Sequence, residues 1–347
     1  MHPNLRCLCL LLSFVVGSSP IAMAADGPTT TAADPTSFSP AILPGSGLAR
    51  YSFVYAGEWD TRKPDAQSIF VVREGQIAWS TTIPLHTPDG GAEEFDDAAM
   101  LPDGNLLYAK MSGAGLITPD KKILWDFRCP PKTECHSVQP IGKNLVLIAL
   151  NGTPSLALVV DTSTGRTVKE IPITTTTTSS HGQYRHIRMT RRHTIVVPLL
   201  GEGRVVEVDL DGRELWSVAA KSPWSAERLR NGNTLIAGDA AGYIREVNPA
   251  GETVWEFTRA DAPQYRLFNT QCARRLTNGN TIISNWVAGY KPVEDWPHTV
   301  QLLEVTPDKK VVWALRSWTD PADLGPATHI FLLNAEDAAE TVNDFEL

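Results

Sequence analysis

Short runs of alternating apolar and polar residues, bounded by Gly, Asn, Asp or Pro, recur from about residue 50 onward. Alternation with a period of two indicates β-strands with one buried face, and the bounding residues are typical of tight turns. The stretch 225–257 shows the layout with strands at 225–229, 234–237, 243–247 and 253–257. Four short strands in succession predict one antiparallel sheet.

A motif within these runs repeats six times: a turn, two residues, an aliphatic residue and then, in five copies, Trp. The copies end at Trp79, Trp125, Lys169, Trp216, Trp255 and Trp313, so their spacings are 46, 44, 47, 39 and 58 residues. Four strands every ~45 residues is the period of a β-propeller blade. We therefore predict an all-β, six-bladed β-propeller over residues 47–334, with four antiparallel strands per blade and the Trp side chains in the seams between blades.

The two ends of this region predict how the ring closes. The first unit supplies only three strands, at 51–55, 68–72 and 76–81, while the segment 328–333 follows the last repeat with no further blade behind it. Pairing that C-terminal strand into the first blade would remove the open edges. We expect the acidic tail at 335–347 to be loose.

The N-terminal residues 1–24 combine one basic residue, an apolar run at 7–16 and the sequence Ala22-Met23-Ala24. This pattern is typical of a cleaved signal peptide, and an uncleaved anchor is the alternative. No later apolar run is long enough to span a membrane. Residues 25–46 are rich in Pro, Thr, Ser and Ala and predict a flexible leader. We expect a periplasmic or secreted protein.

Export would place the three cysteines of the mature chain in an oxidising compartment. Cys129 and Cys135 flank five residues, so they can close a small loop in an oxidising compartment. We predict a disulfide between them, with two free thiols as the alternative. Cys272 has no partner in the mature chain; it is either a small buried apolar residue or a nucleophile beside a histidine.

Charge excludes two classes of partner. Without residues 1–24 the chain has 30 basic and 39 acidic side chains, a net charge of −9. A strongly acidic protein is a poor partner for nucleic acid and for anionic membranes.

In a propeller, the connections from the outer strand of one blade to the inner strand of the next lie on one face. Here they are long and irregular, at 82–96, 127–135, 172–184, 218–224, 258–271 and 315–327. Binding residues concentrate on loops that a rigid scaffold carries, so this is the candidate functional face.

Aligning the inner strands on their turns places one residue per blade at the mouth of the central channel. These residues are Asp97, His136, Arg185, Ser225, Cys272 and His329, with His186 next to Arg185 and Arg188 as a further candidate. A rim of His, Arg and Asp can bind an anion, transfer protons or hold a metal. A solvated polar rim without a function is the alternative. The candidates lack the close spacing of a metal-ligand motif, so we assign no metal ligands and expect no cofactor.

Three stretches carry a resemblance to a known family. They are His136-Ser-Val-Gln, the pattern Arg-Leu-x-Asn-Gly-Asn-Thr-x-Ile at 228–236 and 275–283, and Glu-Val-x-x-x-Gly-x-x-Val-Trp at 246–255. They resemble PQQ-like β-propeller repeats, most of all those of the arylsulfotransferase-like branch. Members of that branch are exported six-bladed propellers that transfer sulfuryl groups between phenols through a channel histidine. The resemblance implies His136 or His329 as the nucleophile, with Arg185 and His186 holding the sulfate.

Three functions remain open at this stage. The first is an enzyme acting on a small anionic aryl or carbohydrate substrate at the channel mouth, with His136 and His329 as catalytic residues and Asp97, Arg185, His186 and Cys272 as binding residues. The second is a non-catalytic propeller that binds a ligand or scaffolds an envelope protein partner. The third is a metal-assisted polysaccharide lyase. The histidine-rich rim favours the enzyme.

Overall fold

The structure, a computed structural model, describes residues 38–290 and 292–346. The predicted signal peptide at 1–24 and the first part of the predicted leader lie outside these ranges. Among the described residues, no helix has the length and apolar character needed to cross a membrane.

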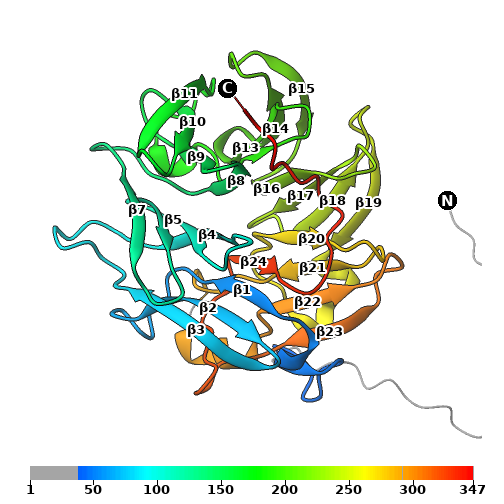
Figure 1. The fold of residues 1–347 in the computed structure, drawn as a ribbon. Helices are drawn as coiled ribbons and strands as arrows, with labels where there is room; N and C mark the ends of the chain where they lie inside the picture. The colour runs from blue at the N-terminus through cyan, green and yellow to red at the C-terminus, as the bar shows by residue number, and fades with distance from the viewer. Residues whose placement is uncertain (1–37, 291, 347) are drawn as a thin grey trace, which may run out of the picture. The chain divides into compact units, whose positions relative to one another are not determined.

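The described chain forms six four-stranded antiparallel sheets, which confirms the six-bladed propeller (Figure 1). The first blade contains β24 (His329–Leu332), β1 (Phe53–Ala56), β2 (Gln67–Arg73) and β3 (Gln76–Ile83). The second contains β4 (Phe95–Met100), β5 (Leu106–Lys110), β6 (Gly113–Ile117) and β7 (Ile123–Arg128). The third contains β8 (Val138–Gly142), β9 (Leu145–Leu150), β10 (Leu156–Asp161) and β11 (Arg166–Pro172).

The remaining three blades follow in chain order. The fourth contains β12 (Arg188–Met189), β13 (Ile195–Leu199), β14 (Arg204–Val208) and β15 (Glu214–Ala219). The fifth contains β16 (Pro223–Arg228), β17 (Thr234–Gly238), β18 (Tyr243–Val247) and β19 (Thr253–Thr258). The sixth contains β20 (Ala273–Arg275), β21 (Thr281–Ser284), β22 (Leu302–Val305) and β23 (Val311–Leu315).

Short 3₁₀ helices lie in the connections. They are η1 (Gly47–Arg50), η2 (Ser180–Gly182), η3 (Leu200–Glu202), η4 (Arg259–Asp261), η5 (Pro263–Tyr265) and η6 (Val293–His298). We call the side that carries the blade-to-blade connections the crossing face. We call the opposite side, with the turns that end the inner strands, the turn face.

The C-terminal strand closes the ring, as the sequence predicts. In β24, His329 pairs with Ala56 of β1, and Leu332 pairs with Phe53. The first blade is therefore built from both ends of the propeller, and its inner strand comes from the C-terminal end.

The motif Trp residues lie at the seams between blades. Their indole N–H groups donate to carbonyl oxygens in other segments: Trp79 to Pro119, Trp216 to Pro249, Trp255 to Pro307 and Trp313 to Gly47, at 2.8–3.0 Å. Each of these bonds ties an indole to a segment outside its own strand pair and so helps to fix how one blade docks on the next segment.

Two seams also hold an Arg–Glu pair beside the Trp. Arg275 of the sixth blade binds Glu246 of the fifth at 2.8 Å and lies 4.3 Å over the ring of Trp255. Arg228 makes the same contacts with Glu207 and Trp216 one seam earlier. The Arg-Leu-x-Asn-Gly-Asn motif thus begins with a seam residue, which explains its recurrence.

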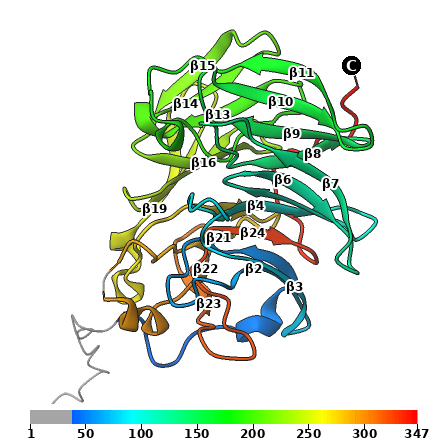
Figure 2. The same ribbon diagram turned by 90° about the vertical axis from the view of Figure 1, so that its left-hand side faces the viewer.

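The acidic tail is not loose. Its backbone bridges to Leu276 and Leu229 on the turn face, through Asp337 and Ala339. Val342 is buried, and Phe345 packs into the core between the third and fourth blades. In Figure 2 the tail ends near β8, where the Phe345 N–H donates to the Ile141 carbonyl at 3.0 Å. Apolar residues spaced among the acidic ones hold the tail down.

The predicted flexible leader is also packed over its described residues, 38–46. Phe38 stacks against Phe268 with ring centroids 6.4 Å apart. Ser39 donates a hydrogen bond to the His298 carbonyl at 2.6 Å. These contacts involve residues more than 200 positions away, which local composition does not reveal.

We expect Phe345→Ala to destabilise the protein by about 3 kcal/mol, because it removes a buried ring from a packed core. The measurement is chemical denaturation of the mature chain. Asp344→Ala, whose side chain is largely exposed, is the control and should leave stability unchanged. Equal stability of both variants would contradict a docked tail.

Candidate functional site

The inner strands place the predicted rim residues at two levels, because the alignment is one residue out in two blades. In the fourth blade the Thr190 N–H donates to the Thr194 carbonyl across the turn, as Leu229 does to Asn233 in the fifth blade. The residue four before Thr190 is His186, so His186 rather than Arg185 faces the channel axis in this blade. In the third blade Ser137 rather than His136 faces the axis, since the Ser137 hydroxyl donates a hydrogen bond to Asp97. A slip of one residue turns a side chain to the other side of its strand.

The ring at the channel axis brings four of the predicted residues together. His329 Nδ1 lies 3.3 Å from Asp97 Oδ1 and 3.8 Å from Cys272 Sγ. The rings of His186 and His329 stack edge to face with centroids 5.3 Å apart. All four side chains are buried. The structure thus joins Asp97, His186, Cys272 and His329 in one cluster from four blades.

Asp97 is the anionic centre of this cluster. It accepts hydrogen bonds from Arg188 at 2.8 and 3.1 Å, from the Ser137 hydroxyl at 3.1 Å and from the Val138 N–H at 3.0 Å. Burial alone would raise its pKa, but Arg188, His329 and His186 together hold the pKa well below the ordinary value. Asp97 is therefore a fixed carboxylate.

His329 is neutral and both its nitrogens are engaged. Arg274 donates to His329 Nε2 at 3.3 Å, so the proton sits on Nδ1 and faces Asp97. Burial lowers the pKa of His329 well below its usual value. Burial also raises the pKa of the Cys272 thiol, so the cysteine is protonated. This arrangement disfavours either residue as a free nucleophile.

Glu227 completes the network. Arg274 Nη1 donates to both of its carboxylate oxygens at 3.0 Å. Burial nevertheless raises the pKa of Glu227 above its ordinary value and outweighs the attraction of Arg274. A pair of carboxyl groups with pKa values pushed in opposite directions, here Glu227 and Asp97, is a common arrangement for acid–base chemistry.

These groups form one end of a cavity of about 660 Å³ on the turn face. Its apolar walls include Met100, Val138, Pro140, Met189 and Phe331. Its charged lining residues are Asp97, Arg188, Glu227 and Arg274, together with Asp103, Lys143, Arg228, Asp337 and Glu340. The tail, from Ala339 to Asn343, lines another side. Its volume lies in the range of small-molecule sites.

His136 belongs to a second cluster, on the crossing face. Its Nδ1 lies 3.0 Å from Asp96 Oδ1 and 3.8 Å from Glu94 Oε1, and its Nε2 lies 2.8 Å from Glu134 Oε2. His181 Nδ1 reaches the same Glu134 oxygen at 3.1 Å. Burial, followed by the nearby Arg185 charge, lowers the pKa of His136 to about 4.

Arg185 lies in this second cluster, away from the ring. Its guanidinium stacks 4.6 Å from the Trp224 ring and donates to the Tyr184 carbonyl at 3.2 Å.

Glu58 is a further acidic residue of the second cluster. Burial, together with repulsion from Asp96, raises the pKa of Glu58 well above its usual value, although Arg185 opposes the shift. The predicted shared site of His136 and His329 is therefore two adjacent sites, joined where the His186 Nε2–H donates to the Asp96 carbonyl at 3.0 Å.

Among residues 38–290 and 292–346, three sets of side chains offer metal-donor atoms within 4.8 Å of one another: Asp97, His186 and His329; Glu134, His136 and His181; and Glu94, Asp96 and His136. The acidic members of the second cluster were not among the residues expected at the channel mouth. For Glu94 and Asp96 the signal was the run Glu-Glu-Phe-Asp-Asp at 93–97, which ends the first crossing connection.

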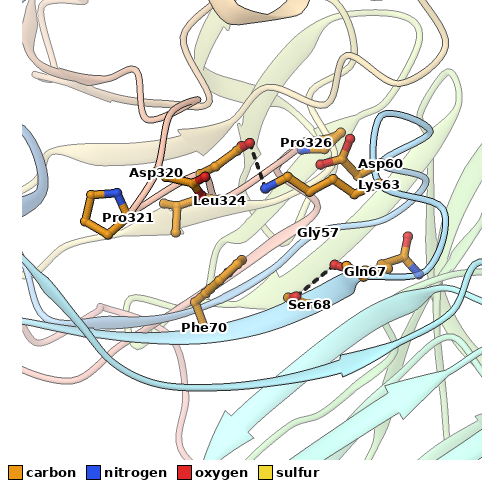
Figure 3. Close-up of a pocket in the computed structure, with 12 residues that line it drawn as sticks. Gly57, Asp60, Lys63, Gln67, Ser68, Phe70, Asp320, Pro321, Leu324 and Pro326 are labelled. Carbon is orange, nitrogen blue, oxygen red and sulfur yellow. Dashed lines mark hydrogen bonds and ion pairs between the residues drawn. The ribbon is translucent and has the colours of Figure 1, made fainter.

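A smaller cavity of about 160 Å³ lies between β2 and the loop that precedes β24 (Figure 3). Lys63 in its wall pairs with Asp323 at 2.7 Å. Arg62 joins Asp60 to the same Asp323. These charges balance one another, and we assign the cavity no chemical role.

The structure gives no disulfide between Cys129 and Cys135, which are both free thiols here. Cys135 packs in the core between the second and third blades, and Cys129 lies against that core. The Cys129 side chain is within hydrogen-bonding reach and, with burial, raises the pKa of Cys135 well above its usual value.

We expect Glu58→Gln to stabilise the chelator-treated protein increasingly as the pH rises from 5 to 8. A carboxyl group with a raised folded-state pKa contributes stability below its unfolded-state pKa and loses it as the pH rises through the folded-state value. Thermal unfolding should show a Tm at least ~2 °C above wild type at pH 8 and little difference near pH 5. Glu256→Gln, on an outer strand beside Arg245, is the control. If the Tm difference between Glu58→Gln and wild type changes with pH no more than that of the control, the prediction is contradicted.

Comparisons with known proteins support the fold. No family model matches the chain, and no curated protein matches its sequence. A protein of unknown function from Bacteroides caccae has 24% identity and a TM-score of 0.70, over 81% of this chain and 98% of that one. A catalytically inactive histidine-to-alanine variant of virginiamycin B lyase from Staphylococcus aureus, with quinupristin, has 11% identity and a TM-score of 0.52, over 79% and 88% of the two chains.

The WD40 β-propeller domain of Doa1 is similar at 12% identity and a TM-score of 0.50, over 67% of this chain and 71% of that one. At these identities the likeness shows the fold alone. The arylsulfotransferase-like branch is not shown by these comparisons; what they establish is that the chain is a β-propeller.

Proposed function

We propose that the protein is an enzyme acting on a small aryl or carbohydrate substrate that carries an anionic group, bound in the turn-face cavity. The observation that carries this proposal is the network of Asp97, Arg188, Arg274 and Glu227 at one end of a cavity of about 660 Å³. A cavity with apolar walls and a few convergent polar groups is the usual form of a small-molecule site.

The substrate class follows from the lining. Arg188 and Arg274 can each donate to a sulfate or carboxylate, and their planar guanidinium groups suit such anions. Met100, Met189 and Phe331 provide apolar surface for a phenyl or sugar ring. We propose sulfuryl transfer or a related reaction of an anionic ring compound.

Acid–base chemistry supports this proposal better than a histidine nucleophile. His329 has both nitrogens engaged and is not among the residues that line the cavity, so we assign it a positioning role. Glu227 lines the cavity and has a raised pKa, which suits a group that accepts the proton of an attacking hydroxyl and returns it to the leaving oxygen.

A non-catalytic ligand-binding propeller is the second candidate, because the same cavity could bind a ligand without converting it. The two functions differ in what the Glu227 carboxyl does: acid–base catalysis needs its proton transfer, whereas binding needs only its shape and hydrogen bonds.

We expect Glu227→Gln to lower kcat at least 100-fold and to change KM by less than about 5-fold, since general acid–base catalysis contributes 10²–10⁴-fold. The assay uses nitrophenyl sulfate with a phenol acceptor, and sulfated or uronic oligosaccharides, with the mature chain. Glu246→Gln is the matched control, because Glu246 is a similarly buried partner of an arginine but lies outside the cavity.

Equal loss of activity in both variants would assign the effect to stability. Binding of these compounds by wild type with no turnover would favour the non-catalytic propeller. Neither binding nor turnover would reject the substrate class.

We also propose that the protein is exported and that Cys129 and Cys135 form a disulfide after export. Supporting this are the sequence pattern of residues 1–24 and the contact between the two thiols. After expression with export, mass spectrometry of the alkylated protein should show one free cysteine, Cys272, and a mature N-terminus at Ala25. Three alkylated cysteines in the exported protein would contradict the disulfide.

A further inference from the structure

The crossing-face cluster has more negative charge than its neighbours can balance. The carboxyl groups of Glu58, Glu94, Asp96 and Glu134 influence one another, and the Arg185 guanidinium opposes the shifts of the first three. Glu58, Glu94 and Asp96 are almost completely buried. Buried charges are stable only when paired or when they coordinate a metal, so this surplus calls for a cation or for protons.

Oxygens in this cluster also lack hydrogen-bond partners among the described residues. One carboxylate oxygen each of Glu58, Glu94 and Asp96 is buried without a partner. The Arg185 Nε is likewise unpartnered, so the guanidinium does not satisfy these oxygens. Buried polar atoms are nearly always bonded, and exceptions indicate a missing water or ion.

The histidine beside them is arranged as a metal ligand. Its Nε2 lies 2.8 Å from Glu134 Oε2, and the same oxygen is 3.1 Å from His181 Nδ1. When Nε2–H donates to this carboxylate, the His136 Nδ1 lone pair faces Asp96 Oδ1 at 3.0 Å. Two ligand atoms about 2.1 Å from one cation lie about 3 Å apart in an octahedral site, so this spacing suits a shared ion.

We propose that Glu94, Asp96 and His136 bind one divalent cation on the crossing face, with Glu134 orienting His136. Two carboxylates and an imidazole form a mixed oxygen and nitrogen donor set, which suits Mn²⁺ or Zn²⁺ better than Ca²⁺. A carboxylate that holds the far nitrogen of a ligating histidine is a common second partner in metal sites. His181 and Glu134 are the more exposed residues beside the proposed site, with side chains 52% and 23% exposed.

The ring at the axis does not share this property, although Asp97, His186 and His329 also lie close together. Asp97 already accepts two hydrogen bonds from Arg188, and Arg274 donates to His329 Nε2. A cation there would meet two guanidinium groups, so the two adjacent clusters have opposite preferences.

Isothermal titration of the chelator-treated, full-length mature chain with MnCl₂ and with ZnCl₂ tests the proposal. We expect one ion per chain and a Tm that rises with ion concentration, because an ion that binds only the folded state stabilises it. Glu94→Gln should weaken binding at least 30-fold and remove the Tm rise, while its ion-free Tm is equal to or above that of wild type. Asp96→Asn should have the same effects, and it replaces Glu94→Gln as the test variant if Glu94→Gln does not fold.

Two variants complete the design. Glu207→Gln alters another buried carboxylate, which is bonded to Arg192 and Arg228, and should keep the single ion with wild-type affinity. His181→Ala changes a half-exposed residue and should weaken binding less than 10-fold. The proposal is overturned if wild type binds neither ion, if both Glu94→Gln and Asp96→Asn bind as wild type does, or if His181→Ala alone abolishes binding. None of these readouts requires a substrate, so they are independent of the proposed enzyme activity.

Discussion

The docking of one blade on the next is the interaction on which the whole structure depends. At the seam of the fifth and sixth blades, Arg275 binds Glu246 and covers Trp255, and the indole of that Trp donates to the carbonyl of Pro307. A cation–π contact contributes about 0.5–2 kcal/mol, and a buried ion pair contributes little net stability. What the seam supplies is register, because the Arg, the Glu and the Trp meet only when the two blades are correctly placed against each other. With the blades so placed, the ring can close by pairing β24 with β1.

A ring held in this way brings residues from distant parts of the chain to one axis, and it does so at two levels. On the turn-face side, Asp97, Arg188, Arg274 and Glu227 form alternating charges whose hydrogen bonds are made. On the crossing-face side, Glu58, Glu94 and Asp96 gather around His136 with unpartnered oxygens. The first arrangement suits an anionic ligand that competes for guanidinium groups, and the second suits a cation. Adjacent residues of β4, Asp96 and Asp97, point to opposite sites because side chains alternate along a strand.

Sequence patterns were sufficient for the architecture because each blade repeats the same local chemistry. The Trp motif, the Asn-Gly-Asn turns and the spare strand at 328–333 predicted the blades and their closure, and β24 confirms the latter. The placement of the candidate site residues was predicted in part. Asp97, His186, Cys272 and His329 meet as expected, but His136 and Arg185 do not join them. The turns of the third and fourth blades lack the Asn-Gly-Asn signal, so their strands were aligned one residue out, and alternation converts that error into the wrong face.

By itself, then, the sequence determined the period, the number of blades and the strand that closes the ring, since these depend on alternation and turn residues that are local along the chain. Tertiary structure alone decided which side chains share a level of the channel, that the acidic tail packs through Val342 and Phe345, and that Glu227 stands beside Arg274. It also brought carboxyl groups from the first three blades together, with buried oxygens that lack partners among the described residues. The reason is physical: burial and pairing of charges depend on distances between segments far apart in sequence, and only the closed ring sets those distances.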